Sequence, residues 1–223
     1  MAEDWYAWHD NYQRNRGLQA RLGLVCEQIS ACMNSCPPGV IRVVSVCAGD
    51  GRDLMSAMID HPRSPDVQAL LVEQDRRLVE VGQSSADLSD LGKQIKFVRG
   101  DATRSAAYRG AVPADLVIVA GVFGHVREQH LNQLVRSLPF ICRPDGFVIW
   151  TRSLKAWDGE RHVALIRQYF LETGFEEVNF QQAAVGASGI GTYKYKGPPV
   201  TLPDNQELFV FSGSEFGQTE VNA

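Results

Sequence analysis

Short apolar runs alternate with longer, more polar segments from Val40 through the middle of the chain. Several of these runs are apolar at nearly every position, which is typical of strands that helices cover on both faces of a sheet. The polar segments between them are long enough to form crossover helices. The predicted strands are VIRVVSV (40–46), VQALLV (67–72), IKFV (95–98), ADLVIVA (114–120) and GFVIW (146–150). The pattern therefore predicts an α/β fold built on an open, parallel, doubly wound sheet.

Helices are predicted in the segments that separate these strands. Their ranges are 52–60, 75–86, 127–139 and 159–173. Gly174 follows the last helix directly, and glycine is the residue that most often ends a helix because it adopts a left-handed conformation without strain. A new strand is expected immediately after it.

Two further helices are predicted at the N-terminus. Trp5, Trp8 and Tyr12 recur at helical spacing, and five apolar residues within 18–32 do the same. The segment NSCPPG (34–39) contains two prolines and a glycine, which end the second helix. The aromatic first helix either packs as an ordinary core face or folds over a ligand pocket as a lid.

The C-terminal part of the chain has a different pattern. FEEVNFQ (175–181) and ELFVFSG (207–213) are predicted strands, and a glycine-rich segment (183–205) joins them. A connection of this length without helical periodicity is typically functional or mobile. The residues that follow Ser212 are polar, and we expect them to fray.

Composition limits the number of domains and the kind of partner. The 223 residues, 44% of them hydrophobic, are enough for one substantial core, so we expect a single domain. It would comprise a helical cap (1–38), a core (40–212) and a polar tail (213–223). The formal net charge of −4 argues against nucleic-acid binding, which requires a positive field. A small neutral or cationic partner fits this charge better.

The sequence also indicates a cellular location and a redox state. No stretch approaches the roughly 20 apolar residues needed to cross a bilayer, and the N-terminus MAEDWYAWHD is acidic, unlike a secretion signal. We therefore expect a cytoplasmic protein without membrane contact. The five cysteines include no C-x-x-C pair, which favours buried reduced thiols over disulfides or a zinc site.

A glycine turn follows the first predicted strand, in RVVSVCAGDGRDL (42–54). Gly49 and Gly51 have no side chains, so a ligand can approach the backbone while the next helix starts beneath it. No G-K-[ST] follows, which excludes a Walker loop, and Leu54 stands where a dinucleotide fingerprint requires a third glycine. The turn alone is a weak signal, since tight glycine turns are also common for structural reasons.

Acidic residues end the next two predicted strands. Glu73 ends the second strand, where a carboxylate can accept hydrogen bonds from the hydroxyls of a ribose. Asp101 ends the third, where a carboxylate can accept from an exocyclic amine such as that of adenine, while the amide of Ala102 can donate to a ring nitrogen. Either acid alone could be a solvated side chain or a helix cap. Together with the turn, they indicate a ligand that contains adenosine but no phosphate.

The sequence resembles the class I S-adenosylmethionine-dependent methyltransferases. The matching stretches are VVSVCAGDGRDL for the glycine motif, LLVEQD for the ribose acid, GDA for the adenine contact and ADLVIVAGVFGHV for the fourth strand and its loop. The resemblance spans about residues 40–212. It implies a Rossmann-like fold with a seven-stranded sheet whose last strand is antiparallel, S-adenosylmethionine as cofactor and S-adenosylhomocysteine as product.

The resemblance also implies a set of cofactor-binding residues. These are Tyr12, Arg21, Ala48, Gly49, Asp50, Gly51, Asp53, Glu73, Gln74, Asp101, Ala102, Gly121 and Val122. Asp50, Asp53 or the N-terminal helices would meet the methionine ammonium, and Arg21 would meet the carboxylate unless it is an ordinary surface arginine. The family usually has an acid where Ser45 stands and a glycine where Cys47 stands, so the start of the motif is atypical.

Candidate catalytic residues are fewer, because the nucleophile of a methyl transfer belongs to the substrate. His125, in GVFGHV after the fourth strand, could take a proton from a hydroxyl or amine, although a loop histidine often makes only a structural hydrogen bond. His9, in the aromatic N-terminal helix, is a second candidate. No catalytic triad is visible, and the region after strand four lacks the [DNS]-P-P-[FYW] motif of enzymes that methylate planar nitrogens.

The best candidates for a substrate wall are aromatic or basic. Trp150 and Arg152 end the fifth strand, Tyr193 lies in the long C-terminal segment, and Trp5 lies in the possible lid. Aromatic walls with a few polar groups suit a small organic molecule. The alternative for TYKYKG (192–197) is a twisted hairpin whose lysines protect a sheet edge.

Three functions remain open from the sequence. The first is a methyltransferase that acts on oxygen, nitrogen or carbon of a small molecule, or on RNA or protein. The second, an NAD-dependent oxidoreductase, would require the third glycine and leaves Asp101 without a role. The third is a methyltransferase-like module that binds ligands or partners without catalysis, which the atypical Ser45 and Cys47 keep open. The oligomeric state is not predicted.

Overall fold

A seven-stranded sheet forms the centre of the computed structural model, which describes residues 15–155 and 158–212. The strand order is β3-β2-β1-β4-β5-β7-β6, in which β1 to β5 are parallel and β7 is antiparallel to both of its neighbours. The strands are β1 (Ile41–Val46), β2 (Val67–Glu73), β3 (Ile95–Arg99), β4 (Ala114–Val119), β5 (Cys142–Ser153), β6 (Phe175–Gln182) and β7 (Ser188–Tyr195). The predicted Rossmann-like sheet, mostly parallel with its last strand antiparallel, is confirmed.

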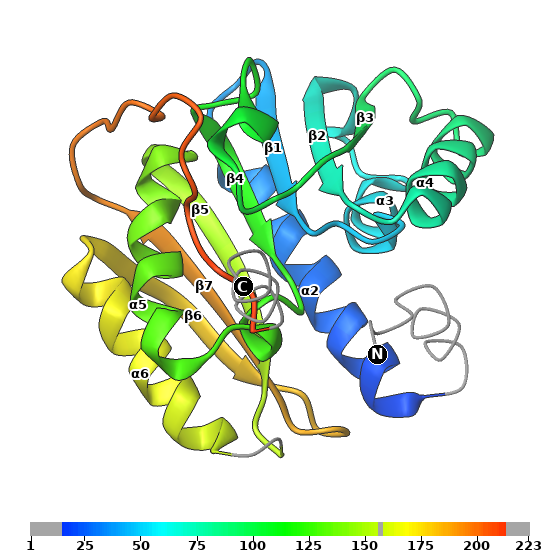
Figure 1. Ribbon diagram of the computed structural model, residues 1–223. Helices are drawn as coiled ribbons and strands as arrows, with labels where there is room; N and C mark the ends of the chain where they lie inside the picture. The colour runs from blue at the N-terminus through cyan, green and yellow to red at the C-terminus, as the bar shows by residue number, and fades with distance from the viewer. Residues whose placement is uncertain (1–14, 156–157, 213–223) are drawn as a thin grey trace, which may run out of the picture.

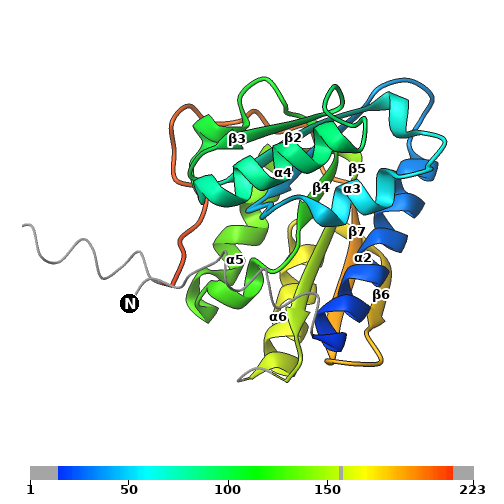
Figure 2. The same cartoon turned by 90° about the vertical axis from the view of Figure 1, so that its right-hand side faces the viewer.

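Helices cover both faces of this sheet, with α2, α3 and α4 on one face and α5 and α6 on the other (Figures 1 and 2). They are α2 (Arg16–Ser35), α3 (Arg52–Met58), α4 (Arg76–Leu88), α5 (Glu128–Ser137) and α6 (Gly159–Glu172). The second predicted N-terminal helix is confirmed as α2, and the first lies outside the described residues. Each helix that the structure describes is too short or too polar to span a bilayer.

Helix α2 is positioned by its cap and by its buried face. The side chain of Asn15 accepts hydrogen bonds from the amides of Gly17 and Leu18, at 2.9 and 3.2 Å, and so satisfies two amides that the helix cannot pair. Ile29 and Met33 are fully buried against the sheet. Since α2 contacts both α3 and β7, it extends along the central strands of the sheet.

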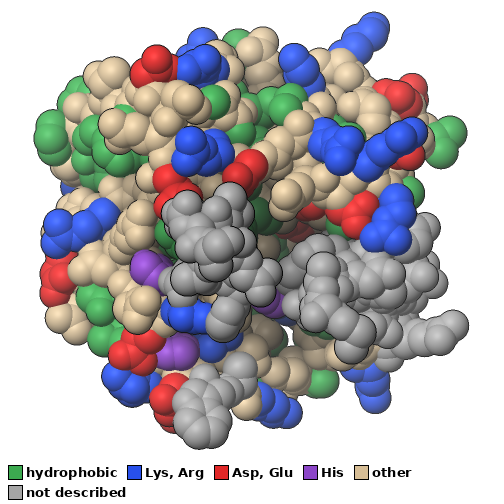
Figure 3. All heavy atoms as spheres, in the orientation of Figure 1, with side chains coloured by type: hydrophobic (Ala, Val, Ile, Leu, Met, Phe, Trp, Pro, Cys, Tyr) green, Lys and Arg blue, Asp and Glu red, His purple; other side chains and the backbone are tan. Residues whose placement is uncertain are grey.

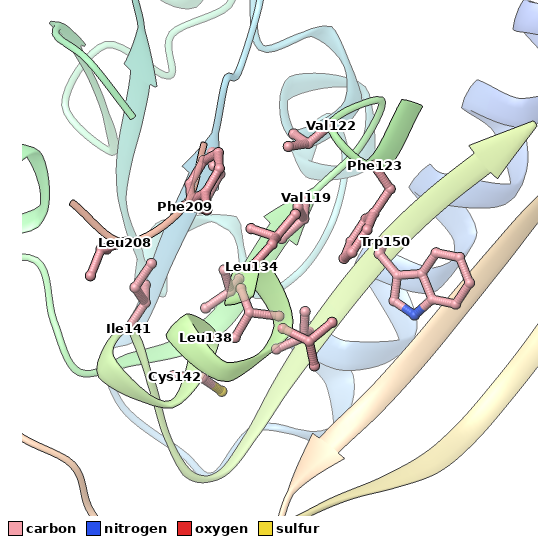
Figure 4. Packing of buried hydrophobic residues seen from close by; sticks show 14 of the residues in the cluster. Val119, Val122, Phe123, Leu134, Leu138, Ile141, Cys142, Trp150, Leu208 and Phe209 are labelled. Atoms are coloured by element: carbon pink, nitrogen blue, oxygen red, sulfur yellow. The ribbon is translucent and has the colours of Figure 1, made fainter. Parts of the chain in front are cut away.

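Successive residues of the central strands bury their side chains in two separate hydrophobic clusters. In β4, Leu116 and Ile118 belong to the cluster under α2, α3 and α4, and Val117 and Val119 to the cluster under α5 and α6. Figure 4 shows part of the second cluster, where Val119, Phe123 and Trp150 lie close together. Burial on both faces explains why this strand is apolar at every position except Asp115, which accepts from the amide of Arg42 and from Nε of Arg143.

The seventh strand is β7, and the prediction that residues 207–213 form it is wrong. Two glycines in β7 give this segment the composition of a loop, but each makes room for an aromatic ring of a neighbouring strand. A Cβ at Gly191 would lie 2.5 Å from Nε1 of Trp150, and one at Gly189 would lie 2.9 Å from the ring of Phe180. The glycines are therefore required by packing between strands rather than by a turn.

The segment predicted as the last strand crosses the face that α5 and α6 cover (Figure 1). Among the described residues, its only β-bridge joins Glu207 to Arg104, which lies outside the named strands, and the amide of Leu208 donates to the carbonyl of Thr103 at 2.7 Å. Leu208 and Phe209 bury their side chains in the hydrophobic cluster of that face (Figure 4). Burial of apolar side chains, and not sheet pairing, explains the apolar pattern of this segment.

Candidate active site

The strand order reverses between β1 and β4, and ligands of open α/β sheets bind at the carboxyl ends of the strands at such a point. The turn after β1 lies there. The amide of Ala48 donates to the carbonyl of Val72 at 2.9 Å, and the amide of Gly49 donates to Oε2 of Glu73 at 2.8 Å. These two bonds join the turn to the end of β2. The predicted turn and ribose acid are therefore adjacent.

The two glycines of the turn adopt left-handed conformations, and Gly51 also packs against the core. Both have a positive φ, 60° for Gly49 and 71° for Gly51. A Cβ at Gly51 would lie 2.5 Å from Leu71 and 2.8 Å from Phe97, so this glycine allows α3 to start against the side chains of β2 and β3. The expectation that Gly51 opens the backbone to a ligand is wrong, because its missing side chain faces the core.

The atypical residues Ser45 and Cys47 lie in different surroundings. Ser45 is buried within β1, whereas Cys47 is half-buried and adopts a left-handed φ of 53°. That conformation costs a residue other than glycine about 1–2 kcal/mol, which is why a glycine is the usual choice in such a turn. Burial raises the pKa of the Cys47 thiol, and the charges of Glu73 and Asp101 raise it further. Cys47 is therefore a neutral thiol at neutral pH.

Glu73 is a buried carboxylate that accepts three backbone hydrogen bonds. Oε2 accepts from Gly49, and Oε1 accepts from the amides of Gln74 and Asp75, both at 2.8 Å. Burial raises the pKa of Glu73, and these three bonds oppose the increase. A carboxylate offers about four acceptor positions, so one remains on Oε2. Gln74, the next predicted cofactor contact, has an exposed side chain.

Asp101 lies after β3, and one of its oxygens fixes the local turn. Oδ1 accepts from the amide and the hydroxyl of Thr103, at 2.9 and 2.7 Å. Among the described residues, Oδ2 has no hydrogen-bond partner, and neither has the amide of Ala102. The predicted adenine contacts therefore combine an exposed acceptor with an adjacent donor.

Arg21, Asp53 and Gly121 lie close together at the crevice between β1 and β4. A Cβ at Gly121 would meet only Nη1 of Arg21 among the described atoms, at 3.9 Å, so the space beside this glycine is open. Burial lowers the pKa of Arg21, and the charge of Asp53 opposes the decrease. Arg21 therefore lies beside the open space at Gly121, and its role as a cofactor contact stays a prediction.

Asp53 and Asp50 differ in their electrostatic surroundings. Burial raises the pKa of Asp53 to about 6, and the charge of Asp50 adds to this, whereas the amide of Leu54 and the charge of Arg21 oppose it. Asp50 is buried and pairs with Arg52, whose Nε lies 2.9 and 3.0 Å from its two oxygens. Asp53 is thus the acid whose ionisation a cationic ligand would favour most.

The loop after β4 contains η4 (Phe123–His125) and the remaining predicted contacts. The side chain of Val122 is buried in the hydrophobic cluster (Figure 4), so only its backbone can face a ligand. The carbonyl of His125 accepts from the amide and the hydroxyl of Ser212, both at 2.9 Å, which ties this loop to the C-terminal segment.

Three further predicted residues, Trp5, His9 and Tyr12, lie outside the described residues.

The prediction that Trp150 and Tyr193 form a substrate wall is wrong. Both are fully buried. Their rings form a cluster with Phe170, whose centroid lies 6.0 Å from Trp150 and 4.5 Å from Tyr193, and the Tyr193 hydroxyl donates to Glu177. The edge-protection alternative is also wrong, because β7 lies between β5 and β6. These aromatic side chains stabilise the core under α6.

Arg152 is the predicted substrate residue that stays at the carboxyl end of the sheet. Its Nη2 lies 3.0 Å from Nδ1 of His162, and Nε2 of His162 lies 3.2 Å from Oε2 of Glu128. Sequence reasoning missed His162 and Glu128, since 34 residues separate them and no local motif links them. Their positions near the amino ends of the helices after β4 and β5 are the signal that could have identified them.

The sequence of residues 6–163 matches the model of a protein family described as "Putative methyltransferase". The match spans more than half of the chain. The chain belongs to this methyltransferase family. No curated protein matches the sequence.

Solved structures with the same fold include proteins named for different reactions. An O-methyltransferase family protein from Burkholderia thailandensis has a TM-score of 0.64 at 12% identity, and the match covers 86% of this chain and 60% of that one. Magnesium protoporphyrin IX methyltransferase from Synechocystis PCC 6803, with bound S-adenosylmethionine, has a TM-score of 0.64 at 14% identity, and the match covers 88% and 99%. The [4+2]-cyclase SpnF has a TM-score of 0.60 at 12% identity, with 82% and 85% covered. The chain thus has the fold of class I S-adenosylmethionine-dependent methyltransferases.

Proposed function

We propose that this chain transfers a methyl group from S-adenosylmethionine to a small organic molecule. The observation that carries the proposal is the meeting of three strand ends: the turn amide of Gly49 bonded to Glu73, with Asp101 at the end of the next strand. The site offers main-chain groups and carboxylates, which suit an uncharged nucleoside better than a phosphate.

The adenosine part would be held by Glu73, Asp101 and Ala102. The acceptor position left on Glu73 can take one ribose hydroxyl without breaking a backbone hydrogen bond. The Oδ2 of Asp101 accepts and the amide of Ala102 donates, which matches the amine and the neighbouring ring nitrogen of adenine. Three polar groups of the chain thereby gain partners that the described residues do not provide.

The methionine part would be held by Arg21 and Asp53. Its carboxylate would meet Arg21 in the open space beside Gly121, and its ammonium would meet Asp53. The zwitterion thereby pairs with one cation and one anion, so neither charged side chain has to be buried without compensation.

S-adenosylmethionine supplies a methyl group on a sulfonium, which is already a good leaving group. The chain itself has to orient the acceptor in line with that methyl group and to receive a proton where the nucleophile is protonated. His125, in the loop that starts at Gly121, is our candidate for this base. Its backbone bonds to Ser212 hold the loop in place.

Two observations support a small-molecule acceptor. The chain carries a formal net charge of −4, which disfavours association with the phosphates of RNA. Magnesium protoporphyrin IX methyltransferase, which is named for a small molecule, shares the fold over 99% of its length.

Methyl transfer is tested with cofactor that carries a labelled methyl group. The purified protein is incubated with this cofactor and an extract of small molecules from its host, and products are separated by mass spectrometry. We expect a labelled small molecule whose amount falls roughly 5- to 150-fold with Glu73→Gln protein at a cofactor concentration below saturation. Label found only in RNA or protein, or in no product, would contradict the proposal.

A further inference from the structure

A hydrogen-bonded chain of three side chains lies at the amino ends of α5 and α6, next to the proposed catalytic loop. Arg152 contacts Nδ1 of His162, and Nε2 of His162 contacts Glu128. A guanidinium has only donors, so Nδ1 must accept. The proton of a neutral His162 is therefore on Nε2 and is donated to Glu128. These hydrogen bonds among Arg152, His162 and Glu128 fix the direction in which the guanidinium of Arg152 points.

Arg152 has hydrogen-bond donors that its contact with His162 does not use. Its Nε is buried, and the described residues offer a hydrogen-bond partner neither to Nε nor to Nη1. A buried donor without a partner costs about 1–3 kcal/mol. Burial also lowers the pKa of Arg152, and no neighbouring carboxylate of the described residues offsets the decrease. Within residues 15–155 and 158–212, Arg152 thus has no direct counter-ion.

Open space lies beside this cation. Gly124 is exposed, and a Cβ at this position would lie 3.3 Å from Nη1 of Arg152. Apart from its chain neighbours, no other described atom would lie within 4 Å of that Cβ. A ligand group can therefore reach Nη1 at this point. His125, the proposed base, is the next residue, so such a ligand would lie at the catalytic loop.

We propose that Arg152 binds a carboxylate of the methyl acceptor, so that the substrates of this chain are small organic acids. This inference rests on the proposed methyltransferase function and names its substrate class. A guanidinium matches the planar, two-oxygen geometry of a carboxylate, and bonds between charged groups of this kind are the strong ones.

The surroundings of Arg152 favour a singly charged anion. Glu128 lies on the far side of His162 and also pairs with Arg161, which in turn contacts Asp158. Figure 3 shows basic, acidic and histidine side chains intermixed in the lower part of this face. Acidic side chains thus lie near Arg152 together with the basic ones. A phosphate would bring its second charge close to these acids.

The test uses protein labelled with nitrogen-15 in arginine and saturated with S-adenosylhomocysteine, whose binding is measured first by calorimetry. Benzoate is titrated as the probe, with the isosteric neutral amide benzamide and with phenyl phosphate as comparisons. We expect benzoate to shift the Arg152 Nε–H signal and to bind about tenfold or more tightly than benzamide. Arg152→Met should abolish this preference, and the control Arg136→Met, which removes an exposed arginine at the other end of α5, should keep it.

Each outcome decides one question. Equal binding of benzoate and benzamide to the wild-type protein, tighter binding of phenyl phosphate, or an unchanged preference in Arg152→Met would overturn the assignment of organic acids. Absence of S-adenosylhomocysteine binding would instead contradict the proposed function. If Arg152→Met does not fold, Arg152→Lys keeps the charge but loses the planar fork, and we expect the preference to fall severalfold.

Discussion

The two carboxylate oxygens of Asp101 have different roles, one structural and one proposed for ligand binding. Oδ1 holds the turn through Thr103, whereas Oδ2 has no partner among the described residues. The same division holds at Glu73, where three backbone bonds leave one acceptor position. A substitution that keeps the first role and removes the second is therefore possible at Asp101.

Asp101→Asn tests the adenine contact. Asparagine keeps an oxygen for Thr103 but places an amide donor where Oδ2 would accept from the adenine amine. We expect the affinity for S-adenosylhomocysteine to fall by about 1–3 kcal/mol, or roughly 5- to 150-fold, with little change in thermal stability. Calorimetry and a thermal melt measure the two quantities. An unchanged affinity would remove Asp101 from the cofactor site.

Asp53 makes the stability of the ligand-free protein depend on pH. Its pKa is raised from 3.8 to about 6. Between these two values the unfolded chain has lost the proton and the folded chain keeps it, so the contribution of Asp53 to stability is complete below pH ~4 and is lost as the pH rises to ~6.

The variant Asp53→Asn removes this contribution and isolates it from that of other acids, including Glu73, whose pKa is also raised. Urea unfolding at about pH 4.5 and about pH 6.5 gives the free energy of unfolding of both proteins. We expect the wild type to lose more stability than Asp53→Asn over this interval. Equal losses in the two proteins would contradict the raised pKa.

At the scale of elements, the sequence was most informative where burial and periodicity agree. β1 to β5 and the helices between them were predicted because parallel strands buried on both faces are apolar at nearly every position. β7 was missed because Gly189 and Gly191 resemble loop residues, and the reason for them lies in the rings of Phe180 and Trp150 on neighbouring strands. Such a requirement is tertiary and leaves no local signal.

The residues of the candidate site also fall into those that the sequence predicts and those that it does not. The turn, Glu73 and Asp101 were predicted because the ends of parallel strands meet at one edge of the sheet. Trp150 and Tyr193 were assigned to that edge, but their side chains point into the core under α6. His162 and Glu128 follow no motif, since only the packing of α5 beside α6 brings them together.

Gly191→Ala tests whether β7 needs its glycines. The added methyl would lie 2.5 Å from Nε1 of the fully buried Trp150, so a core ring has to move. We expect a loss of about 1–3 kcal/mol in the free energy of unfolding, as for other overpacked cores.

Gly23→Ala is the matched control. No described atom lies within 4 Å of a Cβ at this position of α2, and alanine favours a helix more than glycine does, so a gain of about 0.5–1 kcal/mol is expected. Urea unfolding measures both variants. A neutral Gly191→Ala would contradict the packing that we describe for β7.

At the scale of the whole molecule, the fold limits where a ligand binds but not which reaction follows. The reversal of strand order between β1 and β4 places the crevice, and α2 brings Arg21 to it. The same fold occurs in proteins named as methyltransferases and in one named as a [4+2]-cyclase. Function therefore has to be argued from the residues of the site.

The claim on which the account depends is that these strand ends bind the adenosine of S-adenosylmethionine. Calorimetric titration of the wild-type protein and of Glu73→Gln with S-adenosylhomocysteine, and with NADH for comparison, tests it most directly. We predict saturable binding of S-adenosylhomocysteine to the wild type, a loss of about 1–3 kcal/mol in Glu73→Gln, and no binding of NADH. Wild-type protein that is folded and binds NADH, or that binds neither compound, would contradict the account.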